Sequence, residues 1–127
     1  MKANQKVAVI VWTTDPEGQK RFLLRHNKPF NEYEDEWTIT FGGVEENETN
    51  EVAAKREIFE EYAIKDLEEI KDLNYSVGNI YFFAIKIKNL DIKIILNEES
   101  IGYDWMLLDK VLEVMQHNDE KKAFKLI

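Results

Sequence analysis

The chain has 127 residues, of which 44% are hydrophobic and 33% are charged, so we expect one core and one domain over residues 1–127. Its 25 acidic residues outnumber its 17 lysines and arginines, and the formal net charge is −8. Because nucleic acids and membrane surfaces are also anionic, this charge argues against a general nucleic-acid or membrane binder. The lack of cysteine excludes disulfides, zinc–thiolate sites and thiol catalysis.

The first part of the chain predicts a hairpin followed by a loop and a short strand. Residues 6–13 (KVAVIVWT) are rich in β-branched residues and apolar on both faces, which is typical of a central strand. The turn signal at 15–18 (DPEG) separates them from a second strand over 21–26. The polar stretch 27–36 predicts a loop, and 37–41 (WTITF) predicts a short strand that leads into two glycines.

One strong helix is expected over 50–62. Thr49 or Asn50 can serve as its N-cap, because both side chains can accept a hydrogen bond from a free backbone N–H of the first turn. Four apolar side chains are expected to supply its packing contacts: Val52, Ala53, Ile58 and Phe59.

The remainder of the chain predicts strands and then helices. The stretch 68–75 is ambiguous, whereas 78–88, 91–96 and 103–107 predict strands. A helix is expected over 109–117, with a short final helix after it. Strands interrupted by one strong helix, with more helix at the end, predict an α/β fold of the α/β/α sandwich type around a mixed β-sheet.

Three glutamates of the expected central helix, Glu57, Glu60 and Glu61, share one face because they lie three and four residues apart. Like charges at that spacing cost roughly 0.2–0.5 kcal/mol per pair. Two of the three also fall in the last turn, where the helix dipole disfavours anions. A divalent cation such as Mg²⁺, which prefers hard oxygen ligands, removes both objections. A solvated acidic helix face is the other interpretation of the charge pattern.

The stretch from Gly42 to Ile64 (GGVEENETNEVAAKREIFEEYAI) resembles the Nudix box, G-x5-E-x7-R-E-U-x-E-E-x-G-U, in which U is a bulky aliphatic residue. Every defined position matches except Ala63, which stands where the family has glycine. A glycine there suits a left-handed helix end, in which alanine costs about 1–2 kcal/mol. By this motif the chain is identified as a MutT-like member of the Nudix hydrolase family.

The resemblance implies that water attacks a phosphorus of a nucleoside diphosphate that is linked to another group. It implies that Glu57, Glu60 and Glu61 bind Mg²⁺, with Mn²⁺ as a substitute, and that the backbone carbonyl of Gly42 is a further metal ligand. Magnesium in such a site neutralises phosphate charge and lowers the pKa of bound water.

The resemblance also implies roles for residues around these ligands. Arg56 orients the catalytic glutamates, and Glu48 helps to organise the site. The general base is either a box glutamate or a glutamate of a later loop, Glu98 or Glu99. The segment ILNEESIGYDW resembles the family's E-H-x-x-Y-x-W pattern, with Glu99 at the glutamate and Ser100 in place of the histidine. A simple polar turn is the alternative for this loop.

The substrate is less closely defined. Tyr81 stands where dinucleoside polyphosphate hydrolases often carry a tyrosine, although sheet packing also accounts for it. The stretch WTITFGGVE instead resembles nucleoside triphosphate and dihydroneopterin triphosphate pyrophosphohydrolases. Both prolines, Pro16 and Pro29, precede the box, which argues against ADP-ribose as the substrate.

Basic and aromatic side chains offer further candidates for substrate binding. Arg25, together with His26 and Lys28, can bind phosphate or can form a solvated basic cluster. Three aromatic side chains can stack on a base: Trp12, Tyr33 and Trp37. Of these, Trp12 fits the core better, since it lies in the most apolar strand.

We therefore expect a magnesium-dependent pyrophosphohydrolase that cleaves a small-molecule nucleotide, either a nucleoside triphosphate or a dinucleoside polyphosphate. The polar start of the chain and the lack of a long apolar run predict a cytoplasmic protein. A homodimer is compatible with the resemblance, since family members are often dimers. Two alternatives stay open: a catalytically silent Nudix-fold module that binds nucleotides, and an acidic interaction domain without enzymatic activity.

Overall fold

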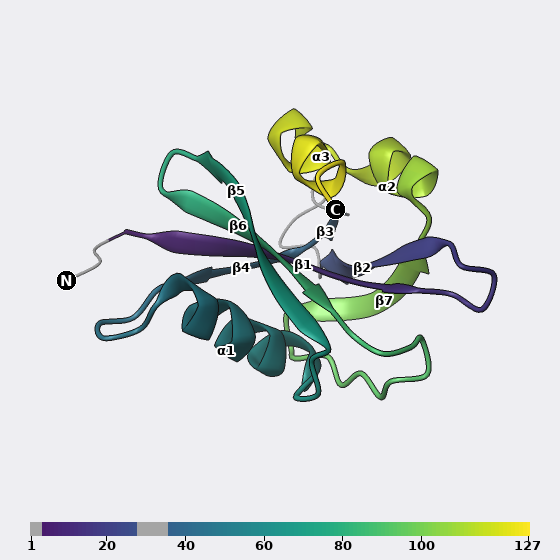
Figure 1. The fold of residues 1–127 in the computed structure, drawn as a ribbon, viewed down its shortest axis with the longest axis horizontal. Helices are drawn as coiled ribbons and strands as arrows, with labels where there is room; N and C mark the ends of the chain where they lie inside the picture. The colour runs from purple at the N-terminus through teal and green to yellow at the C-terminus, as the bar shows by residue number, and fades with distance from the viewer. Residues whose placement is uncertain (1–3, 28–35) are drawn as a thin grey trace.

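The structure is a computed structural model that describes residues 4–27 and 36–127. A mixed β-sheet separates helix α1 (Asn50–Tyr62) from helices α2 (Leu108–Val114) and α3 (Asn118–Phe124), which cover its other face (Figure 1). The predicted α/β/α sandwich is confirmed. No helix among the described residues is long and apolar enough to cross a membrane.

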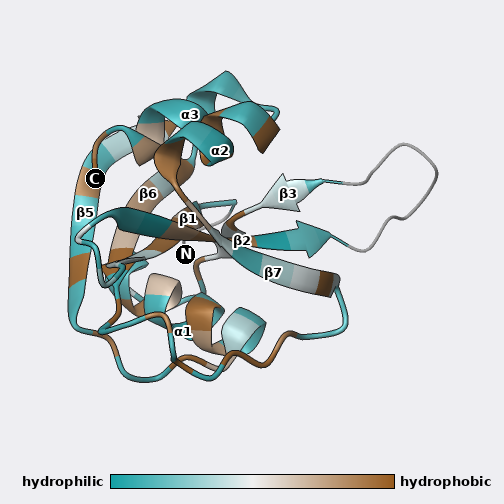
Figure 2. Ribbon diagram, turned by 90° about the vertical axis from the view of Figure 1, so that its right-hand side faces the viewer, coloured by the Kyte–Doolittle hydropathy of each residue, from teal (hydrophilic) through white to brown (hydrophobic). Residues whose placement is uncertain are grey.

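The sheet of the described residues has seven strands. They are β1 (Lys6–Thr14), β2 (Lys20–Asn27), β3 (Trp37–Thr38), β4 (Thr40–Gly43), β5 (Glu69–Val77), β6 (Ile80–Lys86) and β7 (Ser100–Met106). β1 forms the expected antiparallel hairpin with β2 and pairs in parallel with β6. β5 is the edge strand beyond β6, and hydrophilic and hydrophobic residues alternate along it (Figure 2). All but the first residue of the ambiguous stretch 68–75 therefore belongs to a strand.

Strands β3 and β4, which lead into Gly42 and Gly43, lie between β1 and β2 at one end of the sheet. These two strands pair with each other only over Val11–Thr14 and Lys20–Leu23. Farther from the hairpin turn, β3 pairs with β2 and β4 pairs with β1, so residues 37–43 occupy the space between the two diverging strands. This arrangement places the end of β4 beside α1.

Both ends of α1 follow local rules. The side chain of Thr49 accepts a hydrogen bond from the backbone N–H of Val52 at 3.1 Å, which confirms one of the two predicted N-caps. At the other end Ala63 has φ 57° and ψ 32°, and its N–H donates to the carbonyl of Phe59. The left-handed helix end that the family's glycine implies is therefore present, although alanine occupies it.

The predicted packing face of α1 is only half right. Ala53 and Ile58 are fully buried, but Val52 is 50% and Phe59 45% exposed. The helix buries the stripe that also contains Ala54, and the two exposed residues are seven apart on the solvent side. Composition alone did not show which of the apolar residues lie on the stripe facing the sheet.

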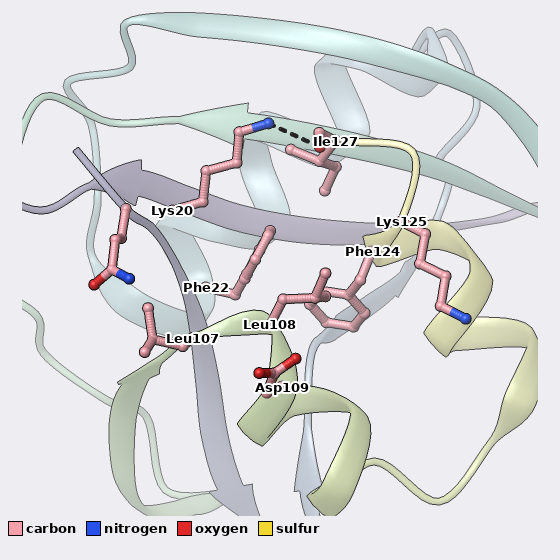
Figure 3. Close-up of a pocket in the computed structure, with 9 residues that line it drawn as sticks. Lys20, Phe22, Leu107, Leu108, Asp109, Phe124, Lys125 and Ile127 are labelled. Carbon is pink, nitrogen blue, oxygen red and sulfur yellow. Dashed lines mark hydrogen bonds between the residues drawn. The ribbon is translucent and has the colours of Figure 1, made fainter.

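The α2/α3 face of the sheet carries a cavity of about 430 Å³ (Figure 3). Phe22 from β2 and Phe124 from α3 form part of its wall, and the Nζ of Lys20 donates to the main-chain oxygen of Ile127 at 2.9 Å. No residue of the 42–64 motif lines this cavity.

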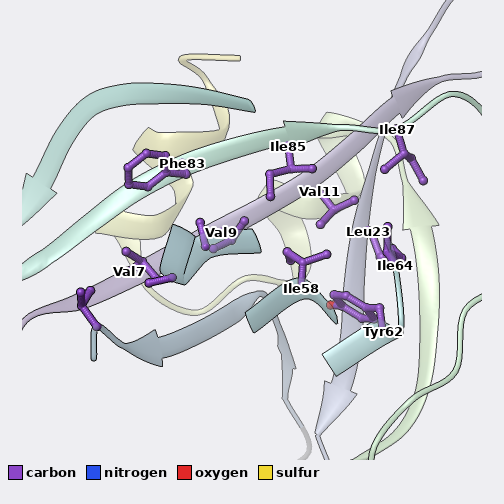
Figure 4. Packing of buried hydrophobic residues seen from close by; sticks show 13 residues of the cluster. Val7, Val9, Val11, Leu23, Ile58, Tyr62, Ile64, Phe83, Ile85 and Ile87 are labelled. Carbon is purple, nitrogen blue, oxygen red and sulfur yellow. The ribbon is translucent and has the colours of Figure 1, made fainter. Parts of the chain in front are cut away.

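Two apolar clusters fill the spaces on either side of the sheet. Val7, Val9 and Val11 of β1 point toward α1, where they meet Ile58 (Figure 4). Ala8 and Ile10 of β1 point the other way and belong to the second cluster, beneath α2 and α3. Trp12 is partly buried and packs against this second cluster. Burial of both faces confirms that 6–13 is a central strand.

The segment 91–96 is not a strand, which contradicts the prediction. Ile92, Ile94 and Leu96 pack against the cluster beneath α1, and the backbone N–H of Ile95 donates to the carbonyl of Tyr62 at 3.0 Å. The alternation of apolar residues thus reflects an extended segment that covers the end of a helix. The predicted helix over 109–117 is also shorter, because α2 ends at Val114, and α3 confirms the expected final helix.

Candidate active site

Arg56 in α1 contacts several of the acidic residues of the motif 42–64. Its guanidinium donates to both carboxylate oxygens of Glu48, at 2.7 and 2.9 Å, and to Glu57 at 2.9 Å. It also donates to Glu60 at 3.2 Å and to the backbone carbonyl of Gly43 at 2.8 Å. Glu48 above all, followed by Glu60 and Glu57, raises the pKa of the Arg56 guanidinium above its ordinary value. The geometry is that of a residue that holds carboxylates in place.

The three helix glutamates differ sharply in burial. The side chains of Glu57 and Glu61 are 12% and 6% exposed, whereas that of Glu60 is 52% exposed. Burial raises the pKa of Glu57, and the positive charge of Arg56 partly offsets this effect. Two of the glutamates therefore face inward and one faces solvent.

Glu61 lies where α1 meets β2 and the loop before β7. Burial raises the pKa of Glu61, and the charge of Arg25, whose Nε is 3.5 Å from the Glu61 carboxylate, opposes the rise. A hydrogen bond from Asn97 also lowers this pKa, while the negative charge of Glu99 raises it. Arg25 also donates to the hydroxyl of Ser100 at 3.1 Å, so Glu61 and the residue that follows Glu99 share one partner. Both Glu98 and Glu99 are exposed in the turn before β7.

Tyr81 lies in β6, on the opposite side of β1 from Gly42. It is 38% exposed and is the register partner of Val7 in β1, which pairs with Gly42 across its other edge. Since Phe83 of the same strand belongs to the α1-side cluster, strand alternation puts Tyr81 on the same side of the sheet. One strand thus separates Tyr81 from Gly42.

The basic and aromatic candidates do not form one group. Arg25 and His26 are neighbours in β2 and point to opposite faces, and His26 stacks on Trp37 with ring centroids 4.6 Å apart. Trp12 has the Nζ atoms of Lys20 and Lys86 over its ring, on the face away from α1. Lys28 and Tyr33 lie outside the described residues.

The donor set suits a hard divalent cation. The carboxylates of the largely enclosed Glu57 and the buried Glu61 have raised pKa values, and Oε2 of Glu61 has no hydrogen-bond partner among the described residues. A β-carbon at Gly42 would overlap Glu57, so the backbone there lies directly against a carboxylate. Within the described ranges no three acidic or histidine side chains converge as a preformed metal site. In this structure arginines hold the carboxylates instead.

The sequence of the whole chain identifies its family. The family model for the NUDIX domain matches residues 4–127. The chain belongs to the Nudix family. Membership confirms the predicted family and its enzyme class, hydrolases that act on pyrophosphate bonds. A search of curated protein sequences found no match.

Solved Nudix structures share this fold. A Nudix hydrolase from M. smegmatis, RenU, is 18% identical with a TM-score of 0.72, covering 96% of this chain and 82% of that one. An Ap4A hydrolase from C. elegans is 19% identical with a TM-score of 0.74, covering 95% and 93%. The NUDIX domain of Shewanella oneidensis NrtR, solved with ADP ribose, is 17% identical with a TM-score of 0.70, covering 96% and 84%. At such identities the likeness concerns the fold.

Some residues of this Nudix site escaped the sequence analysis. Asn97, whose side-chain oxygen accepts the backbone N–H of Glu99, was not singled out, and the hydrogen bond that Ser100 accepts from Arg25 at 3.1 Å was not predicted. Tyr62, at an undefined position of the box, is fully buried beside Glu61. Asn97 and Ser100 lie within two residues of the candidate base Glu99 in the sequence, and this was the available sign that they belong to the site. No local sequence pattern indicates that this segment lies beside α1.

Proposed function

We propose that this Nudix protein is a magnesium-dependent pyrophosphohydrolase that cleaves a phosphoanhydride bond of a nucleoside diphosphate derivative. One observation carries the proposal: the Glu57 carboxylate lies against Gly42 and the Glu61 carboxylate is buried, with every metal-binding position of the box intact. Glu57, Glu60, Glu61 and the carbonyl of Gly42 would hold the ion, and Mn²⁺ can replace Mg²⁺. The bound ion would neutralise phosphate charge and lower the pKa of a bound water.

The chain's own residues would prepare these groups. Arg56 holds Glu48 through two hydrogen bonds and Glu57 through one, which restricts their rotamers before a substrate arrives. The low exposure of Glu57 keeps its carboxylate away from bulk water. We assign to Arg56 the task of orienting catalytic carboxylates.

Glu99 is our candidate for the general base. Ser100, the residue after Glu99, accepts a hydrogen bond from Arg25, and Arg25 pairs with Glu61, so Glu99 lies on the segment that borders the Glu61 carboxylate. Glu99 is also exposed, and a base must reach a water molecule at the reacting phosphorus. A box glutamate is the alternative base.

For the substrate we favour a nucleoside triphosphate or a dinucleoside polyphosphate. The C. elegans structure of similar fold is an Ap4A hydrolase, and the exposed ring of Tyr81 on the α1 side can stack on a base. The single-domain organisation, the cytoplasmic location and the homodimer stay predictions.

A nucleotide-binding module without catalysis is the second candidate. The observation in its favour is that Arg56 and Arg25 already neutralise the inward-facing carboxylates. A domain of similar fold, from NrtR, was solved with ADP ribose.

Turnover on a substrate panel separates the two functions. The panel contains nucleoside triphosphates, dinucleoside polyphosphates, nucleotide sugars and ADP-ribose, with Mg²⁺ or Mn²⁺ and chromatographic identification of products. The proposal expects metal-dependent hydrolysis that is lost in Glu57→Gln and Glu60→Gln. Unimpaired turnover in those variants would refute the site, and thermal stabilisation by a nucleotide without hydrolysis would support the binding module. Labelled water then identifies the phosphorus attacked.

A further inference from the structure

Arg25 in β2 is almost entirely enclosed, with 7% of the residue exposed. Its Nε lies 3.5 Å from Oε2 of Glu61, and neither atom makes a hydrogen bond within the described part of the chain. Removing two charges from water is costly, and a loose geometry recovers only part of that cost. The pair is therefore a poor device for stability.

The other end of the Arg25 guanidinium reaches Ser100, the first residue of β7. Nη1 donates to the hydroxyl of Ser100 at 3.1 Å. Ser100 directly follows Glu99, and the side-chain oxygen of Asn97 accepts the backbone N–H of Glu99 at 3.0 Å. Arg25 thus links Glu61 to Ser100, and the contact with Asn97 fixes the backbone of Glu99 directly before Ser100.

We propose that Arg25 is a positioning residue, which holds Glu61 and the 97–100 loop in one arrangement and so sets the place of Glu99. The inference rests on the proposed hydrolase function of the same site. It differs from the expectation that Arg25 binds phosphate, because the enclosed guanidinium already faces Glu61 and Ser100. Arginine suits this task, since its planar fork can address two partners at fixed angles, whereas lysine offers a single ammonium.

Steady-state kinetics of Arg25→Lys and Ser100→Ala test the role. Both variants should lower kcat, by roughly ten- to hundredfold for Arg25→Lys, with KM changed less than about twofold, because misplacing a catalytic group slows chemistry. Arg21→Lys is the matched control, since Arg21 lies in the same strand, is more exposed and pairs with Asp15. A raised KM with unchanged kcat in Arg25→Lys would instead establish phosphate binding and overturn the proposal.

Amide hydrogen exchange gives a second readout that needs no activity. Arg25→Lys and Ser100→Ala should speed exchange at Glu99 and Ser100 by about tenfold, with β1 unchanged, because the loop loses its anchor. Ser100→Ala leaves the buried ion pair in place, so it tests the link even if Arg25→Lys does not fold. Unchanged exchange in a folded variant contradicts the positioning role. Wild-type protein that hydrolyses nothing, yet shows the exchange change in its variants, contradicts the proposed function alone.

Discussion

The backbone of Gly42 lies against the side chain of Glu57 so closely that a β-carbon at position 42 would stand 1.9 Å from the Glu57 Cδ. Next to it, Gly43 has no heavy atom within 4 Å of such a β-carbon. Neither glycine has a positive φ, so the requirement at Gly42 is for space and not for backbone conformation. A side chain at position 42 would therefore collide with Glu57, whereas position 43 has room for one.

Gly42→Ala should reduce activity far more than stability. The atoms in the way belong to the end of a flexible side chain, so Glu57 can rotate away at a cost of about 1 kcal/mol. Its carboxylate is then lost from the site, and we expect turnover to fall by roughly a hundredfold. Gly43→Ala, which meets nothing, is the control in turnover and thermal unfolding assays. Equal turnover in the two variants would contradict the close contact.

Ala63→Gly should stabilise the protein by about 1 kcal/mol, because glycine adopts the left-handed conformation without the steric cost that alanine bears. Ala54→Gly, in the buried middle of the same helix, should destabilise by about the same amount. Denaturant unfolding measures both changes. Destabilisation by both substitutions would show that α1 does not end as described.

Arg56→Lys should cost about 1–2 kcal/mol of stability and lower turnover by roughly ten- to hundredfold, because one ammonium cannot serve Glu48, Glu57 and the Gly43 carbonyl together. Lys55→Arg is the reciprocal control. Lys55 forms an exposed pair with Glu51, and such pairs contribute little. The role of Arg56 as organiser is wrong if both variants keep wild-type kinetics.

Glu61→Gln should change how stability depends on pH when no metal is present. Burial raises the pKa of Glu61 above the ordinary 4.5, so the folded state favours the protonated acid. The associated stability is present below the ordinary pKa and is lost as pH rises through the raised pKa. The glutamine variant avoids this loss, so its melting temperature should gain on the wild type as pH rises toward neutrality.

The half-exposed Glu60 provides the comparison for this measurement, as Glu60→Gln. Melting profiles of Glu61→Gln and wild type that stay parallel over the acid range would count against the buried carboxylate. With Mg²⁺ or Mn²⁺ added, the wild type should be stabilised and Glu61→Gln should respond less, since a ligand stabilises only the state that binds it.

The sequence alone determined the local features of this protein. The β-branched run over 6–13 identified the central strand, and the two candidate caps Thr49 and Asn50 placed the start of α1 to within one residue. The box spacing identified the family, and it marked Ala63 as a helix end with left-handed geometry. These features depend on neighbours within a few residues, so periodicity and capping rules are sufficient to find them.

Only the tertiary structure decided how the glutamates are used. Charge spacing grouped Glu57, Glu60 and Glu61 on one helix face. In the folded protein Glu57 and Glu61 are largely enclosed, whereas Glu60 is half exposed. The contact of Arg25 with Glu61 and the packing of 91–96 across the end of α1 join segments far apart in the chain. Such contacts depend on which strands pair and on the way the helix faces the sheet, and no local pattern encodes them.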